Sequence, residues 1–440
     1  MNIKNYMILI LTITFALTSC KDDDDPVIEY VTVTETVEKE VTVTNTVEVD
    51  PYADSTLEGN ITSNITLDAS KVWLLKGRVS VVDGVTLTIP AGTVIKAQAG
   101  TGTDASTLII ARGGKIDAQG TSDSPIVMTS VSDNIQAGGT YPSSGPALGI
   151  DARGLWGGLL ILGKAPSSFS GDVTELQIEG IPSSDINGLY GGNDAADNSG
   201  TLKYVSIRHG GAEIGEGNEI NGLTLGGVGN GTVIDNIEVI ANVDDGIEFF
   251  GGTVNASNLL VWGQGDDGLD IDQAYAGTIT NGMVVLEAAS DHGLEIDGPE
   301  GSAAGSFTLK NITLVGATKG CAARGVNGEM ADFRKGATGS LNAVYIKDFV
   351  GGKDIELDAQ ADSDSYAEGK LTFTNIDIQH PVDSDGNTCS GTETINQIFD
   401  DKVDSSKFES DATSFAEIVT SKKEGNGADE SAFSWTFYKR

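Results

Sequence analysis

Between residues 57 and 380 the chain repeats short apolar stretches, each bounded by Gly, Asn or Asp. Examples of these stretches lie at residues 86–89, 108–110 and 159–161. Strands this short and this regularly spaced are typical of a β-sandwich, a barrel or a solenoid. The pattern therefore predicts an all-β body, and its internal repeats must decide the architecture.

One motif occurs three times, at residues 244–249, 266–271 and 291–296. In each copy a Gly follows an acidic turn and precedes alternating apolar and acidic residues, and the copies are offset by 22 and then 25 residues. A repeat of this length with several strands forms one coil of a solenoid, because each coil needs its neighbours to bury a core. The sequence predicts a right-handed parallel β-helix over residues 57–380, with residues 381–440 as a C-terminal cap over the last open edge.

The first residues indicate an export signal, with Lys4, an apolar run at 7–17 and small residues before Cys20. This run of eleven residues is too short to span a bilayer. A Cys at this position resembles a bacterial lipobox, which implies that residues 1–19 are removed and that Cys20 carries a lipid. An ordinary signal peptide with an incidental Cys is the alternative.

Lys21 and the four Asp residues after it resemble the lipoprotein export signal of Bacteroidota. The resemblance implies anchoring in the outer membrane, facing the cell exterior; a solvated acidic linker is the alternative. Residues 20–56 also contain a low-complexity stretch, 27–50, in which every Val occupies an odd position. Such alternation gives one apolar edge in an extended strand, which predicts either a flexible stalk or pairing with a second copy of the chain.

Charge narrows the choice of partners. The chain has 64 acidic and 27 basic residues, a net charge of -37. Nucleic acid and anionic lipid headgroups are therefore poor partners, whereas divalent cations and sugars suit carboxylates. Cys321 and Cys389 could form a disulfide in an oxidising compartment.

Acidic residues dominate the positions that should face outward when the three copies are aligned on their Gly residues. Strand alternation turns the apolar positions inward and the intervening ones outward. The outward positions form one column of Glu248, Asp270 and Glu295 and a second of Phe250, Asp272 and Asp297. Residues 354–358 show the same alternation farther along, which extends the acidic face.

Stacked carboxylates about 4.8 Å apart repel each other by around 1 kcal/mol per pair even in water. Three features could offset this repulsion: bound Ca²⁺, raised pKa values, or nearby Lys and Arg, of which residues 233–309 contain none. The predicted Ca²⁺ ligands are Asp245, Asp267, Asp270, Asp272, Glu295 and Asp297. For the Asp-Asp-Gly turns, a structural role is the alternative to metal binding. Asn236 and Asn258 likewise suit a ladder of stacked amides.

The chain resembles a large group of secreted bacterial β-helix proteins of the pectate-lyase-like superfamily, mostly of unassigned activity. The resemblance lies in residues 92–96, 156–163, 218–229 and 244–255. It implies the fold and says little about function.

A second resemblance is to polygalacturonases, which carry N-T-D, D-D, H-G and R-I-K motifs on successive coils. The matching residues here are Asn242-Val243-Asp244, Asp266-Asp267, His292-Gly293 and Arg324-Gly325-Val326. The resemblance implies that Asp244 and Asp266 activate water, that Asp267 protonates the leaving oxygen, and that His292 and Arg324 orient the substrate. Val243, Asp291 and Val326 depart from the polygalacturonase motifs, which puts hydrolysis in doubt.

Two classes of function remain open. In the first, the rod is a non-catalytic surface that binds Ca²⁺ and an extracellular polysaccharide through Glu248, Asp270 and Glu295, aided by Trp262 and Tyr275. In the second, it is an inverting glycosidase or a lyase that degrades a polysaccharide. A structural or adhesive surface protein is a further alternative.

Overall fold

The computed structural model describes residues 7–17, 29–39, 55–138, 148–213, 219–323, 328–351, 354–403 and 407–438. The chain divides into two units, Met1–Asp50 and Pro51–Arg440. In the first unit, β1 (Met7–Leu17) pairs antiparallel with β2 (Glu29–Lys39). Cys20 lies outside the described residues, so its lipidation, the stalk and pairing with a second copy stay predictions. No helix in the described residues has the length and apolar character needed to cross a membrane.

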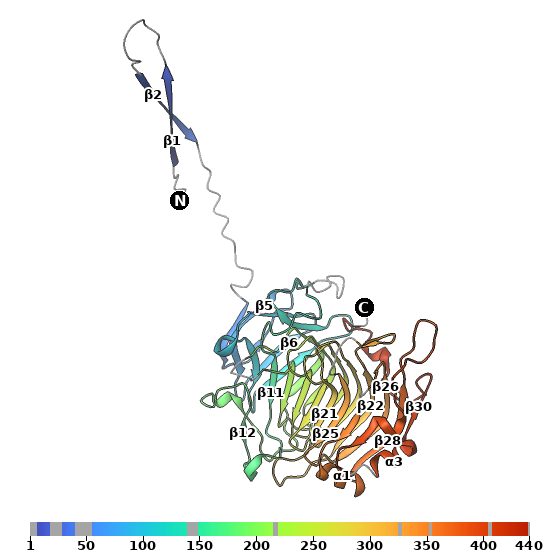
Figure 1. Cartoon of the computed structure of the whole chain (residues 1–440). Coiled ribbons are helices and arrows are strands. Elements are labelled where there is room, and N and C mark those ends of the chain that lie inside the picture. The colour runs from blue at the N-terminus through green and yellow to red at the C-terminus, as the bar shows by residue number, and fades with distance from the viewer. Residues whose placement is uncertain are drawn as a thin grey trace. The chain divides into compact units, whose positions relative to one another are not determined.

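The second unit is a parallel β-helix, as the sequence predicts (Figure 1). Its coils contribute strands to three faces. The third face carries the acidic columns. It begins with residues 59–61 and 78–81 and continues through β8 (Thr107–Ile110), β11 (Leu159–Leu162), β15 (Leu223–Gly226), β17 (Ile247–Phe250), β19 (Leu269–Asp272), β21 (His292–Asp297), β25 (Glu329–Arg334), β27 (Ile355–Leu357) and β29 (Phe399–Asp401).

One long strand in each central coil supplies both the first and the second face. These strands are β14 (Gly200–Arg208), β16 (Val233–Ile240), β18 (Asn255–Trp262), β20 (Thr278–Val285), β22 (Phe307–Val315), β26 (Gly339–Lys347) and β28 (Leu371–Gln379). The opening coils use β3 (Thr56–Ile61), β4 (Ile65–Thr66), β5 (Val72–Val81), β6 (Thr86–Pro90), β7 (Val94–Ala97), β9 (Lys115–Gln119) and β10 (Ile126–Ser130).

A residue with left-handed backbone marks the corner between these two faces. The corner residues are Tyr204, Asn236, Asn258, Asn281, Asn311, Ala343 and Asn375, with φ between 50° and 63°. Asn tolerates this conformation better than most residues. Asn281 Nδ2 donates a hydrogen bond to Asn258 Oδ1 at 2.7 Å, and Asn258 Nδ2 donates to Asp235 Oδ1 at 2.7 Å. The predicted ladder is confirmed for Asn258, whose amide partners are Asn281 and Asp235.

The core lies inside the coils. Ile247, Leu269 and Leu294 stack in register on the third face and are at most 1% exposed. Burying one such side chain contributes roughly 1.5–3 kcal/mol. Since inward and outward positions alternate along a strand, this register also fixes the neighbouring acidic column on the outer side.

The coils continue beyond residue 380, the predicted boundary of the β-helix. β29 extends the third face and β30 (Ala416–Ile418) extends the second. The buried rings of Phe399 and Phe408 close the end of the core, their centroids 5.5 Å apart. Three short helices belong to this end of the protein: α1 (Gln360–Ala367), α2 (Ile395–Ile398) and α3 (Phe408–Phe415).

After β30 the chain returns along the outer side of the second face, and we call residues 419–438 the return segment. Backbone amides of the return segment donate to Thr313 Oγ1, Asn281 Oδ1 and Glu238 Oε1. The return segment therefore covers side chains of coils that precede it by 100 to 200 positions. Elsewhere, Cys321 and Cys389 form a disulfide that joins two loops 68 positions apart.

Candidate functional site

One column of carboxylates runs along the outer side of the third face. Parallel pairing places in register Glu248, Asp270, Glu295, Asp332, Glu356 and Asp400. The register of Glu248, Asp270 and Glu295 confirms the predicted column. Sequence reasoning missed Asp332 and Asp400, although the alternation Ala331-Asp332-Phe333 was a usable signal. We call these six residues the acidic column.

The acidic column is more enclosed than its outward direction suggests. Glu248 is only 6% exposed, and Asn221 Nδ2 donates a hydrogen bond to its carboxylate. An insertion at residues 163–199, which includes β12 (Leu176–Gln177) and β13 (Leu189–Tyr190), packs Phe169 and Tyr190 beside Phe250 on the same face. The first member of the column, Glu248, is therefore buried, whereas the members from Asp270 onward are partly exposed.

The acidic turns form a second row, in which a side-chain oxygen on one coil accepts a hydrogen bond from a backbone N–H of the next coil. Asp245 N donates to Asn221 Oδ1 at 3.2 Å, Asp267 N to Asp245 Oδ1 at 2.9 Å, and His292 N to Asp267 Oδ1 at 2.8 Å. Asp245 and Asp267 are 6% and 3% exposed. These hydrogen bonds support the structural interpretation of the second Asp in each pair.

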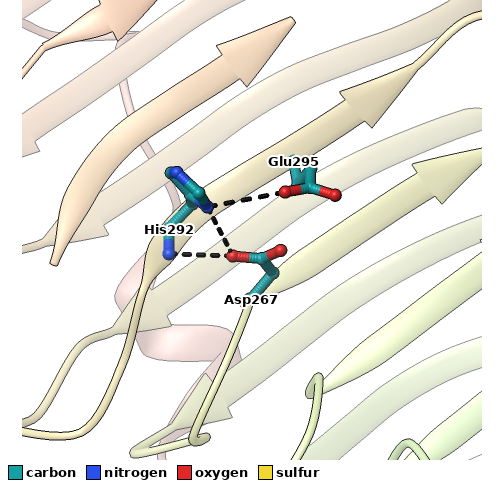
Figure 2. A group of neighbouring side chains, drawn as sticks. All are labelled: Asp267, His292 and Glu295. Atoms are coloured by element: carbon teal, nitrogen blue, oxygen red, sulfur yellow. Dashed lines mark hydrogen bonds and ion pairs between the residues drawn. The ribbon is translucent and has the colours of Figure 1, made fainter. Parts of the chain in front are cut away.

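His292 lies between two of these carboxylates (Figure 2). Its Nδ1 is 2.8 Å from Asp267 Oδ1 and 3.6 Å from Glu295 Oε2. Burial alone would lower the pKa of His292, but the hydrogen bond and the negative charges of Asp267, Asp291 and Glu295 raise it to about 9. His292 thus pairs with Asp267 and lies near Glu295, and these three side chains also form a group that could hold a metal ion.

Basic side chains neutralise the later part of the acidic column. Arg334 pairs with Glu295 and lies 2.7 Å from Asp297, and Lys335 lies 2.5 Å from Asp297. Lys and Arg, which residues 233–309 lack, therefore do offset the repulsion in this part of the column. These side chains belong to the following coil, outside the stretch that lacks basic residues in the sequence.

Lys402 has the same role at the end of the acidic column. Its Nζ lies 2.7 Å from both Glu356 and Asp400 and 3.8 Å from Asp354. The charge of the column is thus compensated unevenly, because the counter-ions gather at its later coils.

The earlier part of the acidic column lacks such compensation. Carboxylate oxygens of Asp245, Glu248 and Asp270 lie within 4.8 Å of one another. Within the described ranges no Lys or Arg pairs with these three, and Asp270 Oδ1 has no hydrogen-bond partner there. Burial, followed by the negative charges of neighbouring carboxylates, raises the pKa of all three carboxyls well above their usual values. We call these three residues the upper cluster.

A second group of carboxylates adjoins the upper cluster at the turns. Asp244, Asp245 and Asp266 also have oxygens within 4.8 Å of one another. Burial and then the charge of Glu179 raise the pKa of Asp244 to about 7. Glu179 comes from the insertion at 163–199, so alignment of the three sequence copies could not reveal it.

A family model described as the pectate-lyase-like β-helix domain matches residues 59–437. The chain belongs to this family. No curated protein and no solved structure matched the chain. The match of the pectate-lyase-like domain spans the last coil and nearly all of the return segment, so both are integral to the fold.

Within this pectate-lyase-like domain, the geometry gives little support to the catalytic roles implied by the polygalacturonase resemblance. Asp267 would have to protonate a leaving oxygen, yet it is 3% exposed and its Oδ1 already accepts hydrogen bonds from His292 N and Nδ1. Asp244 and Asp266, which would both activate water, lie with Asp245 in one crowded cluster. Arg324 lies outside the described residues.

Neither aromatic residue expected at the ligand surface lies there. Trp262 is on the second face, where it packs against Tyr438 at 5.2 Å and donates from Nε1 to Glu287. Tyr275 is 1% exposed, and its hydroxyl donates to Val254 O at 2.6 Å inside the core. The return segment packs against Trp262 and Tyr275 points inward, so neither side chain lies on the acidic face.

The remaining predicted metal ligands lie beside the acidic column in the second outward column. Asp297 is 4% exposed and paired with Arg334 and Lys335. Burial and the charge of Asp297 raise the pKa of Asp272 to about 6. Of the predicted ligands, Asp245 and Asp270 lie together in the upper cluster, whereas Asp267, Glu295 and Asp297 have cationic partners.

Proposed function

We propose that this protein is a non-catalytic surface β-helix that binds Ca²⁺ through the upper cluster and presents the acidic column to an extracellular ligand. The observation that carries the proposal is the crowding of three carboxylates within 4.8 Å on the earlier coils. Like charges this close destabilise the fold unless a cation or protons neutralise them.

The chemistry of the upper cluster fits Ca²⁺. Ca²⁺ takes six to eight oxygen ligands and accepts flexible carboxylate geometry. Asp245, Glu248 and Asp270 supply carboxylate oxygens, and Asp244 and Asp266 lie in the adjoining group. Ca²⁺ would displace the protons that the raised pKa values imply at neutral pH.

For the extracellular ligand we propose a polysaccharide, in keeping with a net charge of -37 that disfavours nucleic acid. The lipobox resemblance at Cys20 supports anchoring in the outer membrane with the β-helix facing the exterior. Neither proposal depends on catalysis.

Polysaccharide cleavage, by hydrolysis or elimination, is the weaker candidate because Asp267 is buried and engaged by His292. It predicts new reducing ends when purified protein is incubated with plant or bacterial polysaccharides. Activity that is lost in Asp267→Asn, in protein that remains folded, would favour the enzyme over the binding protein.

Thermal unfolding in chelator and in millimolar Ca²⁺ tests the cation site. A ligand at about one hundred times its Kd stabilises the native state by about 2.7 kcal/mol, so we expect Ca²⁺ to raise the Tm by several degrees. Asp270→Asn should raise the Tm in chelator, because it relieves repulsion, and should remove most of the rise caused by Ca²⁺.

Asp83→Asn is the matched control, since Asp83 is exposed and lies 3.5 Å from Lys164, away from the upper cluster. It should respond to Ca²⁺ as the unchanged protein does. Equal melting of the unchanged protein in chelator and in Ca²⁺ would rule out the cation site.

A further inference from the structure

A small cavity lies where the return segment meets the second face. Arg208, Ile240 and Trp262 follow one another in register at the ends of β14, β16 and β18. Phe437 of the return segment and the loop at residues 148–150 cover this part of the face, and the space between them has a volume of about 210 Å³. This cavity is on a different face from the acidic column.

The loop over the cavity is held in place by several contacts. Arg153 Nε donates to Gly263 O at 2.9 Å, and Gly154 N donates to Gly210 O at 2.7 Å. A Cβ at Gly263 would lie 2.6 Å from Ile150 Cδ1, so the glycine lets Ile150 pack against the face. The cavity is therefore part of the folded protein.

Apolar side chains make up most of the cavity wall. They are Leu148, Ile150, Ile240, Trp262 and Phe437. Phe437 is fixed from both sides, because its amide donates to Glu238 Oε1 at 2.6 Å and its ring lies 5.2 Å from the Arg208 guanidinium. An apolar cavity of roughly 150 Å³ in another protein is large enough to hold benzene.

His209 adds a second polar side chain to this wall, beside Arg208, which pairs with Glu238. The His209 side chain is 1% exposed, and its Nδ1 lies 2.7 Å from Ala152 O. A carbonyl oxygen can only accept, so Nδ1 carries the proton and Nε2 has a free lone pair. Nε2 is buried and has no hydrogen-bond partner among the described residues. Burial also lowers the pKa of His209, which favours the neutral ring.

We propose that this cavity binds a small aromatic molecule that carries one hydrogen-bond donor, which His209 Nε2 accepts. Three observations select this ligand class: the volume, the apolar wall, and one buried acceptor without a donor. Leaving such an acceptor unpaired is unfavourable, so a ligand that donates to it should bind better than an isostere that cannot. The inference is independent of Ca²⁺ binding.

Indole and 1-methylindole are suitable probes, because they share the ring system and differ in the N–H group. We expect the unchanged protein to bind indole with a Kd of about 0.1–1 mM in calorimetry or saturation-transfer NMR. We expect 1-methylindole to bind about tenfold more weakly. Chelator should not alter either value.

Two variants locate the site. Leu148→Trp should fill the cavity from a half-buried loop position and abolish indole binding, whereas Leu176→Trp, an exposed position on the insertion, should leave it unchanged. His209→Asn suits the left-handed backbone at φ 61° and should bind both probes equally.

Equal binding of the two probes by the unchanged protein, or no binding at all, would overturn the proposal. So would indole binding that persists in folded Leu148→Trp. The comparison of the two probes needs no variant, so it remains decisive if His209→Asn fails to fold.

Discussion

At the scale of single residues, the corners between the first and second faces place the strictest demand on side-chain type. Five of the seven corners are Asn, each with φ near 60°. The side-chain amide of Asn both accepts and donates hydrogen bonds. An Asn at a corner can therefore tolerate the left-handed backbone and also bond to a neighbouring coil. Asn281 does this and also accepts the amide of Asp429 at 2.6 Å, which ties the return segment to the ladder.

Asn281→Ala should lower the free energy of unfolding by about 2 kcal/mol, because it loses the corner amide and leaves the Asp429 N–H unpaired. The midpoint of urea unfolding measures this. Asn60→Ala, at an exposed position on β3, should change it by less than about 0.5 kcal/mol. Equal effects of the two substitutions would contradict the role of the ladder.

The column of Glu248, Asp270 and Glu295 could be predicted because strand alternation leaves only two directions for a side chain once the Gly residues are aligned. Burial was harder to predict. Trp262 was expected at the surface, but it packs against Phe437, which lies about 175 positions later in the chain. Arg334 was missed as a counter-ion because it pairs across coils.

At the scale of elements, the return segment is bound to the β-helix through a buried ion pair. Glu238 is 0% exposed and accepts hydrogen bonds from Ser206 Oγ and from the amides of Phe437 and Tyr438. Arg208, 1% exposed, lies 3.6 Å from the same carboxylate. The end of the return segment therefore completes the environment of a charge located on β16.

Glu238→Ala should destabilise the protein by about 3–5 kcal/mol, because it breaks a buried ion pair and removes the acceptor of the Phe437 and Tyr438 amides. Thermal or urea unfolding would show this as a large shift of the midpoint. The exposed pair Glu58 and Lys76, 3.0 Å apart, is the control. Glu58→Ala should change stability by at most about 1 kcal/mol.

The β-helix itself was predictable from the repeat, but two elements were not. The insertion at 163–199 lacks the repeat, and its packing on the third face depends on apolar contacts such as Phe169 with Tyr190. The last coil, with Phe399 on β29 and Ala416 on β30, was assigned to the cap, because residues 381–440 break the repeat pattern.

At the scale of the whole molecule, raised carboxyl pKa values link stability to pH. Burial and neighbouring charges raise the pKa of Asp244 to about 7, of Asp354 to about 7 and of Glu295 to about 8. Unfolded carboxyls titrate near pH 4. Between pH 4 and 8 the folded protein thus binds more protons than the unfolded chain, and stability falls as pH rises. His292, with a raised pKa of about 9, acts in the same direction above about pH 6.5.

In chelator, the Tm should therefore decrease steadily from pH 5 to pH 8. Added Ca²⁺ should flatten this decrease, because the cation replaces the lost protons at the upper cluster. Scanning calorimetry at several pH values measures both curves. A Tm in chelator that increases with pH over this range would contradict the proposed protonation of the acidic face.

The contact between Glu238 and the return segment has a consequence for how the chain acquires its fold. During translation Glu238 is synthesised before Phe437, and the two residues are 199 positions apart in the chain. Coils can stack as they emerge, but the outer side of the second face stays unfinished until the final residues arrive. Nascent chains stalled before position 435 should therefore be cut by protease at sites that the finished protein shields.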